Sequence, residues 1–538
     1  MLNRRTVLGA AGAALWAQAR ADDAAVTVRV RNGAAGAPVS PLIYGSNEIG
    51  TADGGSPSAA LDRAAGVTAR RFGGNFATTY NWTTNACNAG KDYAQANGDF
   101  LADLLDLPET ERREPGAVIA RMHQNSLAMG AVSLVTLPLA GFVAGDRAGP
   151  VRPDERAPSR RFVPVRWDGA AQAGAPVDPR VADIPHLLAR LVARFGPASG
   201  ATGIRGYILD NEPDLWAEQH PRIVRAPVRI ADLLARALAA ARAIKRIDPE
   251  AWVIGPASWG ATGMASLQSA PDWPAYARHG SFLAAYLDAF RQASERDGRR
   301  LLDGLDVHWY PFSDRGALFR TEDPALSGPL LDAPRSLSEP GFREASWVSR
   351  ALPVSDTAGL ALPLLPSLER LVHAIAPGTR IAVTEYNYGG AGQLASGLAL
   401  ADALCRFARP DMLAATHWGS LDGWLGEAFR LHRNFDGHGG SLPDTVLPAE
   451  ISRPDHVSAR AADAPGRLHV VLINRSETLQ PVDLVLERAV PAGRIATYGF
   501  DAAHPVVCAL GPEEPAGSES VRIVLPPRSA RHCVMRAA

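Results

Sequence analysis

Short apolar runs alternate with longer segments of helical periodicity through the middle of the chain. In the clearest helical segment, residues 229–247, apolar side chains recur at helical spacing, and Pro249 closes the segment before the next apolar run begins. An apolar run followed by a helical segment is typical of βα units that build a parallel sheet. Eight such runs predict a (β/α)8 barrel, and they occupy residues 43–46, 69–73, 133–137, 206–209, 252–255, 305–309, 380–384 and 413–418.

The two ends of the chain show a different pattern, in which apolar and polar residues alternate. Residues 26–30 alternate, as do short segments near the C-terminus, at 467–473, 482–487, 520–525 and 531–535. Short alternating strands separated by turn residues predict a β-sandwich. The expected α/β architecture has an N-terminal strand region at 22–42 that joins the sandwich, a (β/α)8 TIM-like barrel at 43–428 and a C-terminal β-sandwich at 429–538.

Two stretches interrupt the barrel pattern, at residues 147–180 and 318–365. The first is rich in Pro, Arg, Ala and Gly, and the second is rich in Pro and Ser. Long loops in a compact domain are commonly functional or mobile. Both are therefore expected to shape a cleft on one face of the barrel.

The first residues have the pattern of an export signal. Arg4 and Arg5 precede an apolar run at 7–16, and small residues at Ala19 and Ala21 suit a signal peptidase. We expect residues 1–21 to be a twin-arginine signal peptide, with the mature protein periplasmic or secreted. The alternative is an uncleaved N-terminal anchor. No later segment has the length of a membrane-spanning helix, so no membrane association is expected after cleavage.

Composition narrows the choice of partner and of metal site. The 538-residue chain has a formal net charge of −1 and no basic block interleaved with aromatic residues, so nucleic acid is not an expected partner. The four cysteines lack zinc-site spacing. Cys508 and Cys533 both lie in the β-rich part, but sequence does not choose among pairings that also involve Cys87 and Cys405, and buried free thiols are the alternative.

Two glutamates follow predicted strands at the end where barrels carry their chemistry. Glu212 comes after the fourth run and Glu385 after the seventh. Cleavage of a glycosidic bond needs such a pair, because one carboxyl group must be protonated to donate to the leaving oxygen while the other stays ionised. Either glutamate alone has an equally good interpretation as a structural residue. Two at matching strand ends favour catalysis.

Longer motifs around these glutamates resemble glycoside hydrolase family 44. They extend in order along most of the chain, at residues 40–45, 71–75, 79–90, 135–139, 209–216, 220–223, 270–273, 306–311, 384–390 and 429–437. The resemblance implies a barrel joined to a β-sandwich and a retaining endo-β-1,4-glucanase or xyloglucanase. It also implies that Glu212 is the general acid/base and Glu385 the nucleophile. The C-terminal sandwich matches only loosely.

Neighbouring polar residues have candidate roles beside these two glutamates. Asn211 is expected to hold a sugar 2-hydroxyl, and Tyr388 or Tyr310 is expected to donate to Glu385 and keep it ionised. His308 either bridges the site or is a satisfied core histidine. Arg71 is expected to pair with the nucleophile and lower its pKa, or else with some other carboxylate.

Sugar rings present apolar faces, so aromatic side chains at strand ends are candidate platforms. Packing in the core is the alternative for each of them. The candidates are Trp82, Trp216, Trp309, Trp418 and Trp424.

Together these features predict an exported hydrolase of β-1,4-linked glucan, either cellulose-like chains or xyloglucan, acting as a monomer by double displacement. The alternatives are a hydrolase of xylan or mannan, a transglycosylase and a non-catalytic glycan-binding barrel. No organic cofactor is implied. The resemblance allows a structural calcium, whose ligands the sequence does not assign.

Overall fold

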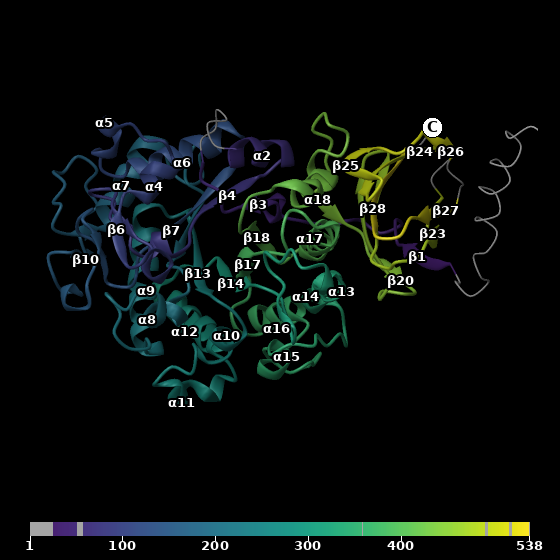
Figure 1. Ribbon diagram of the computed structural model, residues 1–538. Helices are drawn as coiled ribbons and strands as arrows, with labels where there is room; N and C mark the ends of the chain where they lie inside the picture. Colours follow the sequence, from purple (N-terminus) through teal and green to yellow (C-terminus); the bar gives the residue numbers. More distant parts are fainter. Residues whose placement is uncertain (1–24, 51–56, 358, 490–492, 516–518, 537–538) are drawn as a thin grey trace, which may run out of the picture.

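The computed structural model describes residues 25–50, 57–357, 359–489, 493–515 and 519–536. The predicted signal peptide at 1–21 lies outside these ranges. Within them, no helix has both the length and the apolar character needed to cross a membrane. The described chain forms a barrel and a sheet-rich domain that lies at one side of it (Figure 1).

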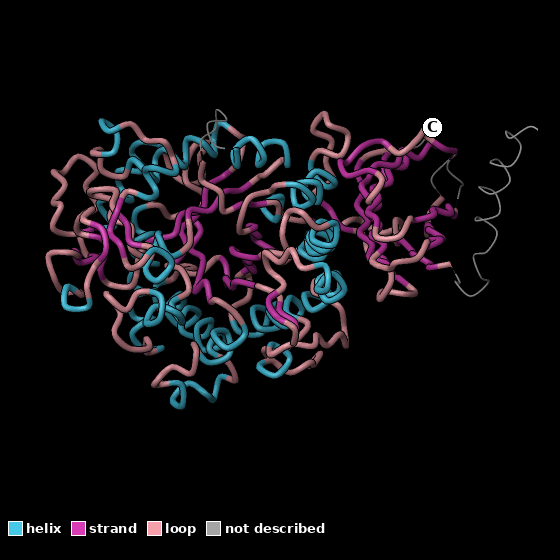
Figure 2. Tube along the Cα trace, in the orientation of Figure 1, coloured by secondary structure: helices cyan, strands magenta, loops and turns pink. Residues whose placement is uncertain are grey.

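Eight parallel strands close into a barrel, and helices surround them (Figure 2). Every strand predicted from an apolar run is present, and both faces of these strands are buried, which explains why they appear as continuous apolar runs. The strands are β3 (Gly45–Ser46), β4 (Ala69–Phe72), β7 (Val132–Leu137), β12 (Gly206–Leu209), β13 (Trp252–Ser258), β14 (Gly304–Trp309), β17 (Arg380–Tyr386) and β18 (Met412–His417).

A principal helix follows each barrel strand in the sequence. The helix predicted at 229–247 is α9, and its buried residues include Leu233, Ala237, Ala241 and Ile244, which lie on one face. The principal helices are α2 (Pro57–Ala65), α6 (Ala117–Ala128), α7 (Ile184–Phe195), α9 (Ile230–Ile247), α12 (Phe282–Asp297), α16 (Leu364–Ile375), α17 (Leu394–Phe407) and α18 (Gly423–Arg433).

The sheet-rich domain is a sandwich of two sheets. One sheet has the order β20 (Ala449–Ile451), β1 (Val26–Val30), β23 (Gln480–Leu486) and β27 (Ser520–Leu525). The other has the order β21 (Val457–Ala464), β22 (Arg467–Asn474), β28 (Ser529–Arg536), β24 (Arg494–Asp501) and β25 (His504–Ala509). β1 pairs in parallel with β23, so the start of the described chain belongs to the same domain as its end.

The expected boundary at residue 429 falls inside α18, and the first strand after this helix is β19 (Thr445–Val446). Phe429 and Leu431 on α18 are buried in the core cluster shared by the barrel. The all-β region therefore begins later than the sequence pattern indicated, because α18 is an amphipathic barrel helix.

The two interrupting stretches contain short elements. Residues 147–180 include β10 (Phe162–Arg166), which pairs with β8 (Phe142–Ala144) and β11 (Ala182–Asp183). Residues 318–365 include the helices α13 (Ser327–Asp332), α14 (Arg335–Ser338) and α15 (Val348–Ala351).

All four cysteines are unpaired in the structure. Cys508 is exposed on β25, whereas Cys533 on β28 is buried in the sandwich core. The disulfide considered between them is not formed, because β24 lies between β25 and β28 in the sheet.

A buried ion network joins the barrel to the sandwich. Asp402 on α17 accepts from Arg406 at 3.0 Å and from Arg475, which directly follows β22, at 2.9 Å. The Asp402 and Arg475 side chains are 1% and 3% exposed. The charges of the two arginines hold the pKa of Asp402 below its usual value, although its burial acts in the opposite direction.

We predict that Asp402→Asn lowers the free energy of unfolding by about 3–5 kcal/mol, because it leaves the buried guanidinium of Arg475 without its carboxylate partner. Calorimetry and denaturant unfolding measure the change. The matched control is Asp483→Asn, which removes a carboxylate paired with Arg522 on the surface of the sandwich and should change stability little. Equal effects of the two substitutions would contradict this account of the domain joint.

Candidate active site

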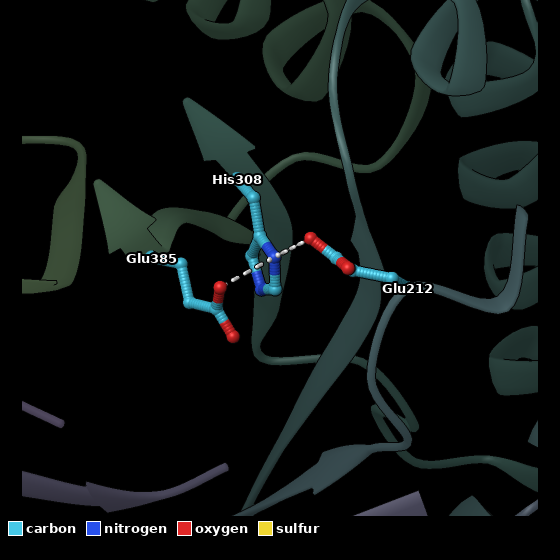
Figure 3. Close-up of side chains that lie close together, drawn as sticks. All are labelled: Glu212, His308 and Glu385. Carbon is cyan, nitrogen blue, oxygen red and sulfur yellow. Dashed lines mark hydrogen bonds and ion pairs between the residues drawn. The ribbon is translucent and has the colours of Figure 1, made fainter. Parts of the chain in front are cut away.

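The carboxyl ends of four barrel strands bring the predicted catalytic residues together. Glu212 follows β12, Glu385 lies near the end of β17, His308 is on β14 and Arg71 is on β4. Parallel strands of a barrel end at the same mouth, so side chains far apart in sequence meet there. Figure 3 shows His308 between the two glutamates.

His308 is fully buried and contacts both carboxyl groups. Its Nδ1 lies 2.9 Å from Glu212 Oε1 and 3.5 Å from Glu385 Oε2. A carboxyl oxygen of each glutamate and a ring nitrogen of His308 all lie within 4.8 Å of one another. The histidine therefore bridges the pair, which was one of the two interpretations of this residue.

Glu385 lies among hydrogen-bond donors. Arg71 Nη1 is 2.6 Å from its Oε1, and the Tyr310 hydroxyl donates to its Oε2 at 2.8 Å. Burial raises the pKa of Glu385, but the positive charge of Arg71 and the hydrogen bonds that Arg71 and Tyr310 donate to the carboxyl group lower it and favour the ionised form. Of the two tyrosines considered as donors, Tyr310 makes the contact.

Glu212 has the opposite electrostatic environment. Burial raises its pKa well above the usual value, and the negative charge of Glu385 raises it further, whereas Arg71 acts in the other direction. Two carboxyl groups this close do not ionise together easily. The environment therefore favours an ionised Glu385 beside a protonated Glu212.

A constrained backbone segment presents Glu212 and Asn211. Asp210 and Glu212 have positive φ values of 67° and 44°, a conformation that residues other than glycine seldom adopt. The buried Asp210 carboxylate accepts from the Thr78 hydroxyl at 2.6 Å and from backbone N–H groups of Leu139 and Ala140. These bonds hold the segment in a conformation that directs Glu212 toward His308 (Figure 3).

Asn211 is held by its side-chain oxygen. Its Oδ1 accepts from Arg71 Nη2 at 2.7 Å and from the Gly74 N–H at 3.2 Å. Arg71 therefore bonds both to the residue beside Glu212 and to Glu385. Because one guanidinium positions groups on two strands, it fixes the relative placement of the two sides of the site.

Four residues predicted to bind substrate do not contact the site. Trp82 and Trp309 are 1% and 2% exposed and lie in the barrel core. Tyr388 is completely buried near Glu344, away from Glu385. Trp424 packs against Phe500 of the sandwich, with ring centroids 5.9 Å apart. These predictions were wrong because proximity to a strand end does not determine which way a side chain points.

The other two predicted tryptophans lie beside the catalytic residues. Trp418 is half-buried after β18, and its ring lies against Gly74, where a Cβ would come within 2.5 Å of it. Trp216 is buried, and its indole N–H donates to the Asn211 carbonyl at 3.1 Å. Trp418 therefore lies beside Gly74, whose N–H bonds to Asn211, whereas Trp216 supports the backbone of Asn211.

Further aromatic side chains at the mouth were not predicted. Trp259, directly after β13, stacks on Trp347 from the second interrupting stretch, with centroids 5.7 Å apart. Tyr93 is half-exposed and contacts Phe76 and Phe100. The position of Trp259 immediately after a strand could have identified it from the sequence. Trp347 lies in a loop that was expected to shape the cleft.

The structural calcium that the family resemblance allows has no evident site among these side chains. In the described ranges, Glu212, His308 and Glu385 form the one group of at least three His, Cys, Asp or Glu residues that are close enough to share an ion. Calcium takes six to eight oxygen ligands, and this group offers an imidazole nitrogen at its centre. The group does not fit calcium.

Several known proteins are similar in sequence to this chain. The family model for glycoside hydrolase family 44 matches residues 86–313. Endoglucanase A of Paenibacillus lautus is 34% identical over 530 residues, covering 95% of this chain and 73% of that protein. Beta-mannanase/endoglucanase A of Caldicellulosiruptor saccharolyticus is also 34% identical, covering 90% of this chain and 37% of that protein.

A solved structure extends the likeness to three dimensions. The Paenibacillus polymyxa xyloglucanase from glycoside hydrolase family 44, determined with xyloglucan, is 32% identical to this chain. It superimposes with a TM-score of 0.88, covering 95% of this chain and all of that one. Similarity of this extent, with two glutamates at the mouth of the same type of barrel, shows that the chain belongs to glycoside hydrolase family 44.

Proposed function

We propose that this glycoside hydrolase cleaves internal bonds of a β-1,4-linked glucan, with Glu385 as nucleophile and Glu212 as general acid/base. The observation that carries the proposal is the asymmetry between the two carboxyl groups. Arg71 and Tyr310 stabilise the charge on Glu385, whereas burial and the Glu385 charge favour the proton on Glu212. One group is prepared to attack and the other to donate, as the reaction requires.

The reaction proceeds in two displacements. Glu385 attacks the anomeric carbon while Glu212 gives its proton to the glycosidic oxygen, which leaves with the departing chain. Glu212, now ionised, then takes a proton from water, whose oxygen bonds to the anomeric carbon and releases Glu385. We infer that the amide of Asn211, whose oxygen accepts from Arg71, contacts the 2-hydroxyl of the sugar.

The separation of the carboxyl groups supports retention of configuration. A ligand oxygen of one lies within 4.8 Å of a ligand oxygen of the other, which is compatible with the separation of about 5–5.5 Å between the carboxyl groups of retaining enzymes. The same asymmetry argues against a binding-only barrel, because sugar binding alone requires neither a protonated nor an ionised glutamate.

The names of the relatives favour a glucan backbone as the substrate of this chain. One relative is named an endoglucanase and one solved structure is of a xyloglucanase with xyloglucan. Trp418, the Trp259–Trp347 stack and the exposed Tyr93 supply aromatic surface at the mouth for sugar faces. Mannan is the second candidate, since another relative is named a β-mannanase/endoglucanase, although this chain spans only 37% of that protein.

Export through a twin-arginine signal and a monomeric state belong to the same proposal. The Arg4–Arg5 pair, the apolar run and the small residues before Asp22 support export. The mass of the mature protein recovered from the host's periplasm or medium tests this. We expect a chain beginning near Asp22, and a full-length chain that stays with the membrane would contradict it.

We predict that Glu385→Gln and Glu212→Gln each reduce the rate of hydrolysis of xyloglucan and carboxymethyl-cellulose by about 10²–10⁴-fold. Glu212→Gln should retain more activity on an aryl glycoside with an activated leaving group, which needs little protonation. Glu385→Gln should not, because it lacks the nucleophile. The control is Glu218→Gln, an exposed glutamate on the adjacent helix α8 (Trp216–Gln219). Rescue of Glu385→Gln by the activated substrate would reverse the assignment.

We also predict a bell-shaped dependence of kcat/KM on pH. Activity falls at low pH as Glu385 becomes protonated and at high pH as Glu212 loses its proton. Arg71 lowers the pKa of both groups, so Arg71→Gln should move both limbs to higher pH, and Arg71→Lys should move them less because it keeps the charge. Limbs that stay in place in Arg71→Gln would contradict this electrostatic role.

A further inference from the structure

A buried chain of hydrogen bonds leads from the floor of the site to Glu212. Asp306 on β14 accepts from the Thr384 backbone N–H at 3.1 Å and from the Thr384 hydroxyl at 2.7 Å. The Thr384 hydroxyl oxygen lies 3.3 Å from His308 Nε2, and His308 Nδ1 lies 2.9 Å from Glu212 Oε1. Asp306, Thr384 and His308 are each 0% exposed, so water does not compete for these bonds.

The direction of each bond follows from counting protons. The hydroxyl of Thr384 has one hydrogen. Burial raises the pKa of Asp306 to about 6, so above that pH the carboxyl group is ionised and requires this hydrogen as a donor. The Thr384 oxygen can then only accept from His308, so the proton of the neutral imidazole lies on Nε2. Nδ1 is left with a lone pair, and the hydrogen in its 2.9 Å contact with Glu212 must belong to the carboxyl group.

The charges around His308 agree with a neutral ring. Burial lowers its pKa, and Arg71 lowers it further, while Glu385, Asp306 and Asp214 act in the opposite direction. Glu385 Oε2, 3.5 Å from Nδ1, already accepts the Tyr310 hydroxyl hydrogen. Glu212 Oε1, at 2.9 Å from Nδ1, is both closer and free of that bond, so it is the hydrogen-bond partner of Nδ1.

Thr384 is itself held in place. Its carbonyl oxygen accepts from the Thr416 hydroxyl and from the Asn47 side-chain amide, the latter at 3.0 Å. Since its backbone N–H is bonded to Asp306, the hydroxyl has little freedom to turn away from His308. The chain is a rigid part of the barrel floor.

We propose that Asp306 and Thr384 are positioning residues that fix His308 in its Nε2–H tautomer, so that the Nδ1 lone pair keeps the proton on Glu212. This rests on the proposed role of Glu212. Once Glu212 has given its proton to the leaving oxygen, its carboxylate faces the same lone pair, which favours recovery of a proton from the attacking water. One fixed tautomer thus serves both the acid step and the base step.

The direct test is the tautomer of His308. Imidazole-¹⁵N NMR of the mature protein with ¹⁵N-labelled histidine, with the His308 signal assigned by its loss in His308→Gln, should show Nε2 protonated and Nδ1 unprotonated at a pH above the Asp306 pKa of about 6. An Nδ1–H ring, or a doubly protonated ring, would overturn the proposal. This measurement needs no substrate, so it stands even if no polysaccharide is cleaved, and absence of hydrolysis would overturn the proposed function alone.

Substitutions provide the second readout. Thr384→Val removes the hydroxyl with little change of shape, and we expect a mixed tautomer, an alkaline limb at lower pH and kcat on xyloglucan reduced by at least about tenfold, the factor equivalent to one hydrogen bond. Activity on an activated aryl glycoside should fall less. The control is Thr136→Val on β7, a buried threonine whose hydroxyl lacks a partner among the described residues.

Asp306→Asn should have the larger effect, because an amide can donate to Thr384 and so reverse the direction of the chain. The Nδ1–H tautomer should then appear. If Thr384→Val matches Thr136→Val in tautomer, alkaline limb and kcat, the proposal is wrong.

Discussion

Two carboxyl groups share one buried, low-dielectric site, and they cannot both be charged at little cost. The side chains around them at the barrel mouth determine which of the two carboxyl groups keeps its proton. Arg71 and Tyr310 stabilise negative charge on Glu385. Glu212 lies across His308 from this charge, so burial and repulsion both favour its protonated form. The chemical roles differ because the surroundings differ, although the side chains are identical.

The scaffold maintains this difference. Arg71 connects Glu385 on one strand with Asn211 beside the other glutamate, and the bonds of Asp210 hold the unusual backbone that presents Glu212. On the outside of the barrel, the sandwich is joined to helix α17 by the ion pair between Asp402 and Arg475. Burial makes each of these polar contacts strong and also makes the loss of one partner expensive.

The sequence predicted the barrel well because parallel strands buried on both faces appear as short apolar runs. It placed Glu212, Glu385, Arg71, His308 and Tyr310 at strand ends, where the structure brings them together. It misplaced Trp82, Trp309, Trp424 and Tyr388, because position in a strand or helix does not show whether a side chain faces the mouth or the core. The contacts of Asp306 and Thr384 depend on the register between β14 and β17, which a single sequence does not reveal. The domain boundary was set too early because α18 lies between the last barrel strand and the sandwich.

The most direct test of the division of roles is to trap the covalent intermediate. A 2-deoxy-2-fluoro β-cello-oligosaccharide with an activated leaving group slows release of the sugar from the nucleophile, and mass spectrometry of the digested protein locates the bond. We expect one added glycosyl group per chain, on the peptide that contains Glu385. A label on Glu212, or complete turnover of the reagent with inversion at the anomeric carbon, would contradict it.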